Sequence, residues 1–178
     1  MLPSLVYGGI RRIIERNARR VYYAPLVGAI AFGATLTMSV PCVPILTLAV
    51  LLNPPQWRRI VLCAALGSGC GALLLLLAFH HLGWSELVAR FPEILTSRTW
   101  GQITGWLERY QLPALFVVAA SPLPQTPSLV FAAIAEVPPV EVFATLAAGK
   151  LLKYGVVAWC VVRFPHWFTD PPTHRAGV

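Results

Sequence analysis

The chain has 178 residues, of which 57% are hydrophobic and 12% are charged, and its formal net charge is +7. Soluble domains usually contain about 25% charged residues, so this composition excludes an ordinary soluble domain and indicates an integral membrane protein. Nucleic-acid binding is the alternative explanation of the positive charge. Basic and aromatic residues are not interleaved as base stacking requires, so we expect no nucleic-acid partner.

The first 20 residues are predicted to form a basic amphipathic segment. The stretch YGGIRRIIERNARR has five arginines between positions 11 and 20 and no apolar run ahead of them, which argues against a cleavable signal peptide. On a helix, Ile10, Ile13 and Ile14 would share one face and most of the arginines another. Such a helix binds a membrane surface through apolar burial and attraction to anionic lipid.

Two proline-flanked apolar segments repeat along the chain. The first, PCVPILTLAVLLNPP, begins at Pro41, and the second, PQTPSLVFAAIAEVPP, begins at Pro124. Each starts with Pro-x-x-Pro, continues through mostly apolar residues and ends with Pro-Pro. Each is followed by an apolar run with a cluster of small residues, AALGSGCG at 64–71 and ATLAAGK at 144–150. The shared order of these features favours an internal duplication.

The lengths of the apolar runs predict how each repeat meets the membrane. A helix needs about 20 residues to cross a hydrocarbon core of about 30 Å. In the second copy, 112–120 and 128–137 are each only half that long, and the prolines of PLPQTP between them prevent one continuous helix. We therefore expect a re-entrant helical hairpin in each copy, with one long kinked span as the alternative. The expected hairpin tips are Pro41 and Pro44 in the first copy, and Pro122, Pro124 and Pro127 in the second.

Each hairpin is expected to be followed by a spanning helix, at 60–79 in the first repeat and at 140–162 in the second. The basic residues of the two termini then fall on one side, and the other side receives most of the acidic residues. Because positive charge marks the cytoplasmic side, the two hairpins enter from opposite sides. The predicted fold class is an all-α integral membrane protein with two inverted-topology repeats, each a re-entrant helical hairpin followed by a transmembrane helix.

These features define one membrane domain over 21–162, preceded by the basic segment. Within repeat one, Gly67 and Gly71 form a small-xxx-small pair, which predicts close packing between helices. The expected boundaries are 1–20 for the basic amphipathic segment, 21–83 for repeat one, 84–111 for a linker, 112–162 for repeat two and 163–178 for a cytoplasmic tail.

The four cysteines indicate neither a metal site nor a disulfide. Cys42, Cys63, Cys70 and Cys160 all lie in apolar runs without CxxC spacing or a nearby histidine partner. We expect them to be buried thiols that pack as small hydrophobic groups. The chain is accordingly expected to work without a metal or a cofactor.

Four segments of the chain resemble a known family when they are taken in order over residues 30 to 162. They are TMSVPCVPILTLAVLL, ALGSGCGALLLLLAFHHLG, LPALFVVAASPLPQTPSLVFAAIAE and AAGKLLKYG. In this order they resemble the DedA or SNARE-associated (VTT domain) membrane proteins, most closely their YqaA-like branch. The resemblance implies two facing re-entrant loops and lipid translocation, which includes scrambling of phospholipids in eukaryotic members and recycling of undecaprenyl phosphate in bacterial ones.

The chain departs from the usual DedA pattern in both loops. Typical members have an acidic residue before the prolines of the first loop and arginines in an F-x-R-F-x-P-x-x-R pattern in the second. This chain has the uncharged stretches SVPCVP and AASPLPQTP at those places. The family links the missing charges to proton coupling and phosphate handling. A proton-coupled mechanism therefore does not transfer from the resemblance.

The expected binding residues surround the middle of the last span. An ammonium at the bilayer centre costs about 3 kcal/mol on insertion scales, so Lys150 should face a cavity or a polar partner. We expect it to attract the phosphate of a lipid headgroup. The alternatives are that the lysines extend toward the interface, or that Lys150 pairs with Glu136 or Glu141. The expected substrate-binding set is Lys150, Lys153, Tyr154, Ser121, Gln125, Thr126 and Ser39.

The function predicted from these features is transport. We expect a flippase-like or scramblase-like protein that moves a phospholipid or polyprenyl phosphate between leaflets. The expected partners are membrane lipids, including those with anionic headgroups, and further copies of the chain in a homo-oligomer. The expected location is the bacterial inner membrane, with several spans and both termini in the cytoplasm. Two alternatives are an intramembrane lipid-modifying enzyme and a non-transporting membrane assembly factor. We do not expect an enzyme, because no adjacent Asp, Glu and His residues form a catalytic set.

Overall fold

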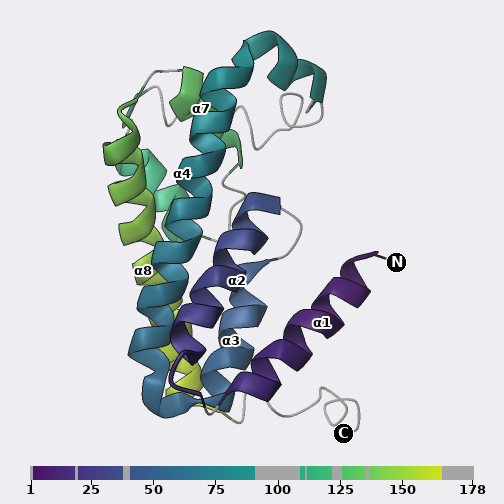
Figure 1. Cartoon of the computed structure of the whole chain (residues 1–178). Coiled ribbons are helices and arrows are strands. Elements are labelled where there is room, and N and C mark those ends of the chain that lie inside the picture. Colours follow the sequence, from purple (N-terminus) through teal and green to yellow (C-terminus); the bar gives the residue numbers. More distant parts are fainter. Residues whose placement is uncertain are drawn as a thin grey trace, which may run out of the picture.

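The computed structural model describes residues 2–18, 20–37, 41–90, 109–110, 112–121, 126–134 and 137–165. Every regular element in this part of the chain is helical, as the predicted all-α class requires (Figure 1). The elements are α1 (Leu2–Asn17), α2 (Tyr23–Thr37), α3 (Cys42–Leu52), the 3-10 turn η1 (Pro54–Gln56), α4 (Trp57–Arg90), a helix over 112–120, α7 (Thr126–Ile134) and α8 (Pro139–Arg163).

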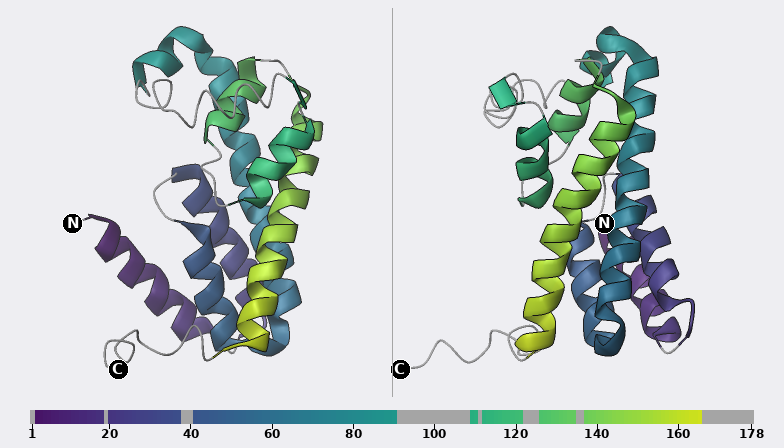
Figure 2. Two further views of the ribbon diagram at one scale, coloured as in Figure 1. Left: turned by 180° about the vertical axis from the view of Figure 1, so that it is seen from behind. Right: turned by 90° about the vertical axis from the view of Figure 1, so that its left-hand side faces the viewer.

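Two helical segments are long and apolar enough to cross a membrane. They are Pro54–Phe79, with a mean hydropathy of 2.4, and Pro139–Arg163, with a mean hydropathy of 1.4. The prediction of long apolar helices at 60–79 and 140–162 is thereby confirmed. The two helices, α4 and α8, pack against each other and run in opposite directions along the length of the molecule (Figure 2).

The shorter helices form two pairs at opposite ends of α4 and α8. The pair α2 and α3 lies at the end where α4 begins and α8 finishes, which we call the basal end (Figure 1). The helix over 112–120 and α7 lie at the other end, which we call the apical end (Figure 2). With 15 and 11 residues, α2 and α3 are roughly 22 and 16 Å long, which is less than the thickness of a hydrocarbon core.

Prolines explain where these helices begin. Pro54 opens η1 just ahead of α4, and Pro139 is the first residue of α8. At these positions the missing N–H would have no partner within the helix anyway. Pro41 precedes α3 and Pro44 lies in its first turn, where proline is also tolerated. The chain therefore ends α2 at Thr37 and starts a new helix instead of continuing the old one.

The helix α4 continues beyond its apolar part. It extends to Arg90, into the stretch that the sequence assigns to a linker over 84–111, and it bends over at the apical end (Figure 1). Apart from 109–110, the rest of that linker lies outside the described residues. The composition shift to polar residues near position 84 marks the end of the apolar stretch, but polar residues such as Glu and Arg propagate a helix well.

The helix α1 contacts the rest of the molecule along a narrow edge. Ile14 is fully buried and Ile10 is partly buried, whereas Ile13 is 46% exposed. The sequence placed all three isoleucines on one face of the helix for contact with a membrane surface, and that contact stays a prediction. Neighbouring residues on a helix lie about 100° apart around its axis, so a narrow contact can bury Ile10 and Ile14 but leaves Ile13 outside.

Glycines allow α2 and α4 to approach closely. A Cβ added at Gly28 would lie 2.7 Å from the carbonyl oxygen of Cys63, and one added at Gly71 would lie 2.8 Å from the carbonyl oxygen of Phe32. A Cβ at Gly67 would overlap the carbonyl oxygen of Gly28. The close packing predicted for the pair Gly67 and Gly71 is thus confirmed, and α2 is the helix that they face.

The four cysteines are free thiols, but they are not all buried. Cys42, Cys63 and Cys160 are half-buried, whereas Cys70 is exposed on the surface of α4. The expectation of a buried thiol is wrong for Cys70. Its neighbours on either side, Gly69 and Gly71, are buried in helix contacts, so Cys70 itself lies on the outer side of the helix.

The hydrophobic interior is divided into two clusters, one above the other. On α4, the fully buried members of the basal cluster end at Ala65 and those of the apical cluster start at Ala72. On α8, the apical cluster ends at Leu146 and the basal cluster starts at Tyr154. The interval between the clusters lies near the middle of both long helices. Polar side chains occupy that interval.

Candidate functional site

The interval between the two hydrophobic clusters holds a buried group of polar side chains, which we call the polar cluster. Its members are Thr35 of α2, Cys42 of α3, Ser68 of α4, and Lys150 and Tyr154 of α8. The Lys150 ammonium donates hydrogen bonds to the hydroxyl oxygen of Ser68 at 2.6 Å and to its backbone oxygen at 3.0 Å. Ser68 therefore joins the two long helices near their midpoints.

The hydrogen bonds of the polar cluster form one directional chain. The Ser68 hydroxyl oxygen accepts from Lys150 and also from the Tyr154 hydroxyl at 3.4 Å, so both of its lone pairs are used. Its own hydrogen is then donated to the Thr35 hydroxyl at 2.6 Å. Thr35 in turn donates to the Cys42 sulfur at 3.8 Å, and the Cys42 thiol donates to the backbone oxygen of Ala31 at 3.9 Å. This series of hydrogen bonds links α2, α3 and α4 to α8.

Lys150 is a buried cation whose partners are neutral. Its side chain is 4% exposed and Ser68 is 1% exposed. Within the described residues, Lys150 forms no ion pair with a carboxylate, and its third N–H has no hydrogen-bond partner. Buried charges are usually paired, because an unpaired charge in an apolar medium costs several kcal/mol. This ammonium therefore retains both the charge and the donor that an anion would need.

The neighbouring Lys153 has a different role. Its ammonium donates to the backbone oxygen of Ser121 at 2.6 Å, just beyond the end of the helix over 112–120. The Ser121 hydroxyl donates to the backbone oxygen of Val118 at 3.0 Å. The last carbonyl groups of a helix carry partial negative charge, so a cation at that end is stabilising. Lys153 thus ties α8 to the end of the first helix of repeat two.

Small residues bring the helices together at this level. A Cβ at Gly149 would lie 2.7 Å from the Ala119 side chain and 2.9 Å from the backbone oxygen of Phe116, both on the helix over 112–120. A Cβ at Gly69 would lie 3.1 Å from the Phe143 ring of α8. The small-residue clusters of the two repeats are therefore both located at helix crossings, and they place Ser68 opposite Lys150.

One further polar atom, on α7, is buried without a partner among the described residues. The hydroxyl of Ser128, in the first turn of α7, is 0% exposed and has no hydrogen-bond partner in the described part of the chain. Leaving such a group unsatisfied costs about 1 to 3 kcal/mol. Ser128 follows the broken stretch of repeat two and lies close to the free backbone N–H groups at the start of α7.

The structure places the expected site residues in two groups and leaves others undescribed. Lys150 and Tyr154 meet in the polar cluster, and Lys153 meets Ser121. Thr126 and Pro127 are described only as the first two residues of α7. The remaining expected residues, Ser39, Pro122, Pro124 and Gln125, lie outside the described residues.

The two alternatives for Lys150 can be compared with its geometry. The side chain points inward to Ser68 instead of extending toward an interface. Glu141 is exposed in the first turn of α8 and forms no ion pair with Lys150, and Glu136 lies outside the described residues. A role for Lys150 in substrate binding remains a prediction.

Sequence reasoning missed Ser68 and Thr35. Ser68 lies in GSGCG, where only the glycines were considered, and Thr35 lies near the end of the apolar α2. A signal for Ser68 was available, because a hydroxyl inside a cluster of small residues on a spanning helix is well placed to bond across the crossing. No comparable signal marks Thr35, which depends on the close approach of Gly71 to α2.

Comparison with known families identifies the domain that carries these features. The VTT domain matches residues 40–163, from just before Pro41 to the end of α8. This chain belongs to the VTT domain family. The match confirms the resemblance to DedA and SNARE-associated proteins, while the YqaA-like branch stays a prediction. No curated protein and no solved structure matches the chain.

Membership of the VTT family has two consequences for the site. The family is membrane-associated and the domain contains two apolar helices of spanning length, so the chain is a membrane protein. The matched region also contains every residue of the polar cluster except Thr35. Among the described residues, no group of three or more His, Cys, Asp or Glu side chains could hold a metal ion. The absence of a metal or cofactor in the working protein stays a prediction.

Proposed function

We propose that this VTT domain moves a phosphate-bearing lipid between the leaflets of the membrane, and that the polar cluster contacts the headgroup on its way. The observation that carries this proposal is the buried ammonium of Lys150, which has only Ser68 as its partner and keeps one N–H unused within the described residues. A phosphate oxygen that accepts this N–H would supply the missing negative charge. A purely structural lysine in lipid would gain more from a carboxylate partner.

The positions of the two helix pairs support a path for the lipid headgroup through the membrane. In our proposal both pairs are re-entrant hairpins, the first entering from the basal side and the second from the apical side. Thr35 and Cys42 lie on either side of the break in the first pair, and Ser121 precedes the break in the second. Residues next to both breaks therefore contact α4 or α8 near mid-depth. Breaks at the membrane centre are typical of transporters built from inverted repeats.

The headgroup would be held mainly by one charge and several neutral donors. The Lys150 ammonium attracts the phosphate, and the Ser128 hydroxyl of α7, which has no partner among the described residues, is a further donor. The first N–H groups of α7 add the partial positive charge of a helix amino end. The acyl chains remain in the bilayer while the headgroup passes, so the protein needs to shield only the polar part of the lipid.

Reconstitution into liposomes tests the proposal directly. The purified chain is incorporated into vesicles that contain fluorescent phosphatidylglycerol, and dithionite then quenches the lipid exposed on the outside. We expect Lys150→Met to slow leaflet exchange at least about tenfold, which corresponds to ~1.4 kcal/mol in the barrier. Thr47→Val is the matched control, because among the described residues the Thr47 hydroxyl bonds only within its own helix, to the backbone oxygen of Val43 at 3.0 Å.

The outcomes separate the three classes of function. Exchange that is no faster than in protein-free vesicles would reject lipid transport and favour an assembly factor. Equal exchange in the wild type and in Lys150→Met would reject the role of Lys150. A new lipid species detected by mass spectrometry after incubation would instead indicate the lipid-modifying enzyme. Circular dichroism of each variant checks that the helices are retained.

A further inference from the structure

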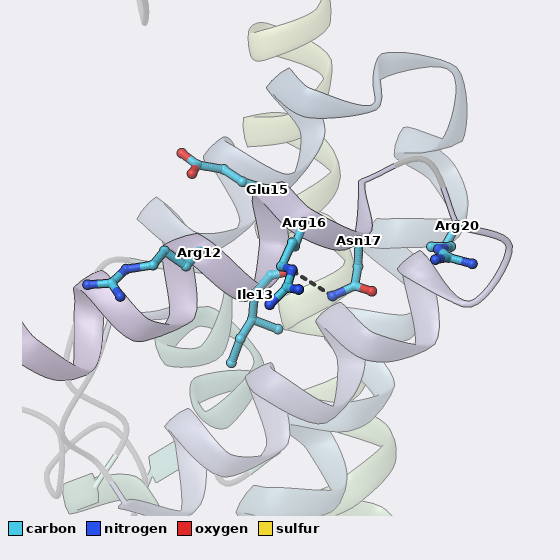
Figure 3. A pocket seen from close by; sticks show the side chains of 6 residues that line it. All are labelled: Arg12, Ile13, Glu15, Arg16, Asn17 and Arg20. Atoms are coloured by element: carbon cyan, nitrogen blue, oxygen red, sulfur yellow. Dashed lines mark hydrogen bonds between the residues drawn. The ribbon is translucent and has the colours of Figure 1, made fainter.

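The corner between α1 and α2 gathers three arginines around a surface pocket at the basal end. Arg12 and Arg16 lie on the last turns of α1, and Arg20 lies in the turn that follows (Figure 3). Arg12 and Arg16 are four residues apart on α1 and therefore share one side of that helix, and Arg20 lines the same pocket from the following turn. Figure 3 shows Arg16 beside Ile13 and Asn17, with Arg20 beyond Asn17. We call Arg12, Arg16 and Arg20 the arginine corner.

The charges of the arginine corner are not balanced by the protein. The acidic residue in the pocket, Glu15, is already paired with Arg11, whose Nε lies 2.7 Å from the Glu15 carboxylate and whose pKa is raised by that contact. Arg12, Arg16 and Arg20 are exposed and have no carboxylate partner within the described residues. Three guanidinium groups with free donors form a ready site for a phosphate, which they can bind bidentately.

Hydrogen bonds hold the backbone of this corner in place. The Asn17 amide donates to the backbone oxygen of Ile13 at 2.9 Å, and its own oxygen accepts from the Tyr22 hydroxyl at 3.0 Å. The Asn53 amide, at the end of α3, donates to the backbone oxygen of Ala18 at 2.8 Å. The corner is therefore fixed both internally and to repeat one before any ligand arrives. A preorganised site loses less entropy when it binds.

Apolar side chains next to the arginines indicate what kind of phosphate binds. Val21 is 93% exposed, and Ile13 and Tyr22 are about half exposed. A soluble anion or a nucleic acid gains nothing from such aliphatic surface. A lipid does, because its glycerol and acyl region lies directly beside its phosphate. The basal end also presents Arg58, Arg59 and Arg163 as exposed residues on α4 and α8.

We propose that the arginine corner binds the phosphate of an anionic phospholipid in the leaflet at the basal end, while Ile13, Val21 and Tyr22 contact its apolar part. This site is separate from the polar cluster and does not depend on the proposed transport. Its consequence is that α1 lies against lipid with its last turns at headgroup level. The site then anchors the domain to an anionic leaflet and retains one lipid next to repeat one.

Native mass spectrometry of the detergent-solubilised full chain tests this site with phosphatidylglycerol as the probe. We expect Arg16→Gln with Arg20→Gln to raise the Kd of the tightest lipid at least about tenfold, since each basic residue near an anionic surface contributes about fivefold. Arg58→Gln with Arg59→Gln removes the same charge from the same end and should change the Kd less than about twofold.

Four results would overturn the proposal. They are equal losses in the two double variants, an unchanged Kd in Arg16→Gln with Arg20→Gln, equal binding of phosphatidylcholine, and displacement of the lipid by inorganic phosphate. The last would identify a site for a soluble anion. If the double variant does not fold, Arg20→Gln alone replaces it, since Arg20 lies outside α1.

Discussion

The hydroxyl oxygen of Ser68 lies 2.6 Å from the ammonium of Lys150, which is 82 residues away in the chain. This contact joins the small-residue cluster of repeat one to that of repeat two. It also lies between the two hydrophobic clusters, near the middle of both long helices. Ser68 and Lys150 therefore contribute to stability as well as to the proposed transport.

Ser68→Ala is expected to destabilise the domain. The substitution removes the acceptor of Lys150 and Tyr154 and the partner of Thr35, all of which are buried. Loss of a buried acceptor for a charged donor costs about 2 to 3 kcal/mol, which lowers the melting temperature of a domain of this size by ~5 °C or more. Thermal unfolding in detergent, followed by tryptophan fluorescence, measures the shift. Cys70→Ala, two residues away on the exposed side of α4, should melt as the wild type does.

Gly67→Ala and Gly33→Ala should have opposite effects. A Cβ at Gly67 would overlap the Gly28 backbone, whereas a Cβ at Gly33 would meet nothing within 4 Å. We expect Gly67→Ala to destabilise by about 2 kcal/mol or more as α2 is pushed from α4, and Gly33→Ala to be neutral or stabilising by up to ~1 kcal/mol. Chemical denaturation in detergent measures both. Equal stability of the two variants would contradict the close crossing of α2 and α4.

Lys153→Met should loosen the end of the helix over 112–120. The variant loses the 2.6 Å hydrogen bond to the backbone oxygen of Ser121 and the favourable charge at that helix end. We expect faster amide hydrogen exchange over 112–121 and unchanged exchange in α2 and α3. Leu152→Met, an exposed neighbour on α8, serves as the control. Protection that is unchanged in Lys153→Met would show that the lysine does not hold this helix.

Cysteine labelling can test the proposed membrane orientation. Arg163, the last residue of α8 at the basal end, is exposed, and Val140 at the apical start of α8 is 76% exposed. In a cysteine-free background with vesicles of known orientation, an impermeant maleimide should reach Arg163→Cys from one side only and Val140→Cys from the other. A permeant maleimide should label both. Labelling of both positions from the same side would rule out α8 as a spanning helix.

Several parts of the fold were predictable because they depend on local physics. Apolar runs of 20 or more residues locate the long helices, and the hydropathy of Pro54–Phe79 and Pro139–Arg163 is independent of what they touch. Prolines mark where α2 ends and α3 begins, because they remove a donor wherever they stand. The exposure of Cys70 was not predictable, since it depends on how wide a stripe of α4 is covered.

The candidate site was predictable only in part, for a similar reason. Lys150 and Tyr154 stand out because a charge and a hydroxyl at four-residue spacing interrupt an apolar helix. Ser68 and Thr35 do not stand out, since small hydroxyl residues are common in tightly packed spans. Their role appears only when α2 and α8 cross α4 at the same level.

By itself the sequence determined that this is a helical membrane protein with two proline-broken segments, a long apolar helix after each, and a lysine near the middle of the last one. Composition, helix length and proline chemistry depend on residues that are close together in the sequence, so the amino-acid sequence alone is enough to recognise them. The tertiary structure alone decided the partner of that lysine. Ser68 and Lys150 are distant in the chain, and only the glycine-lined crossings of α4 with its neighbours bring them into contact.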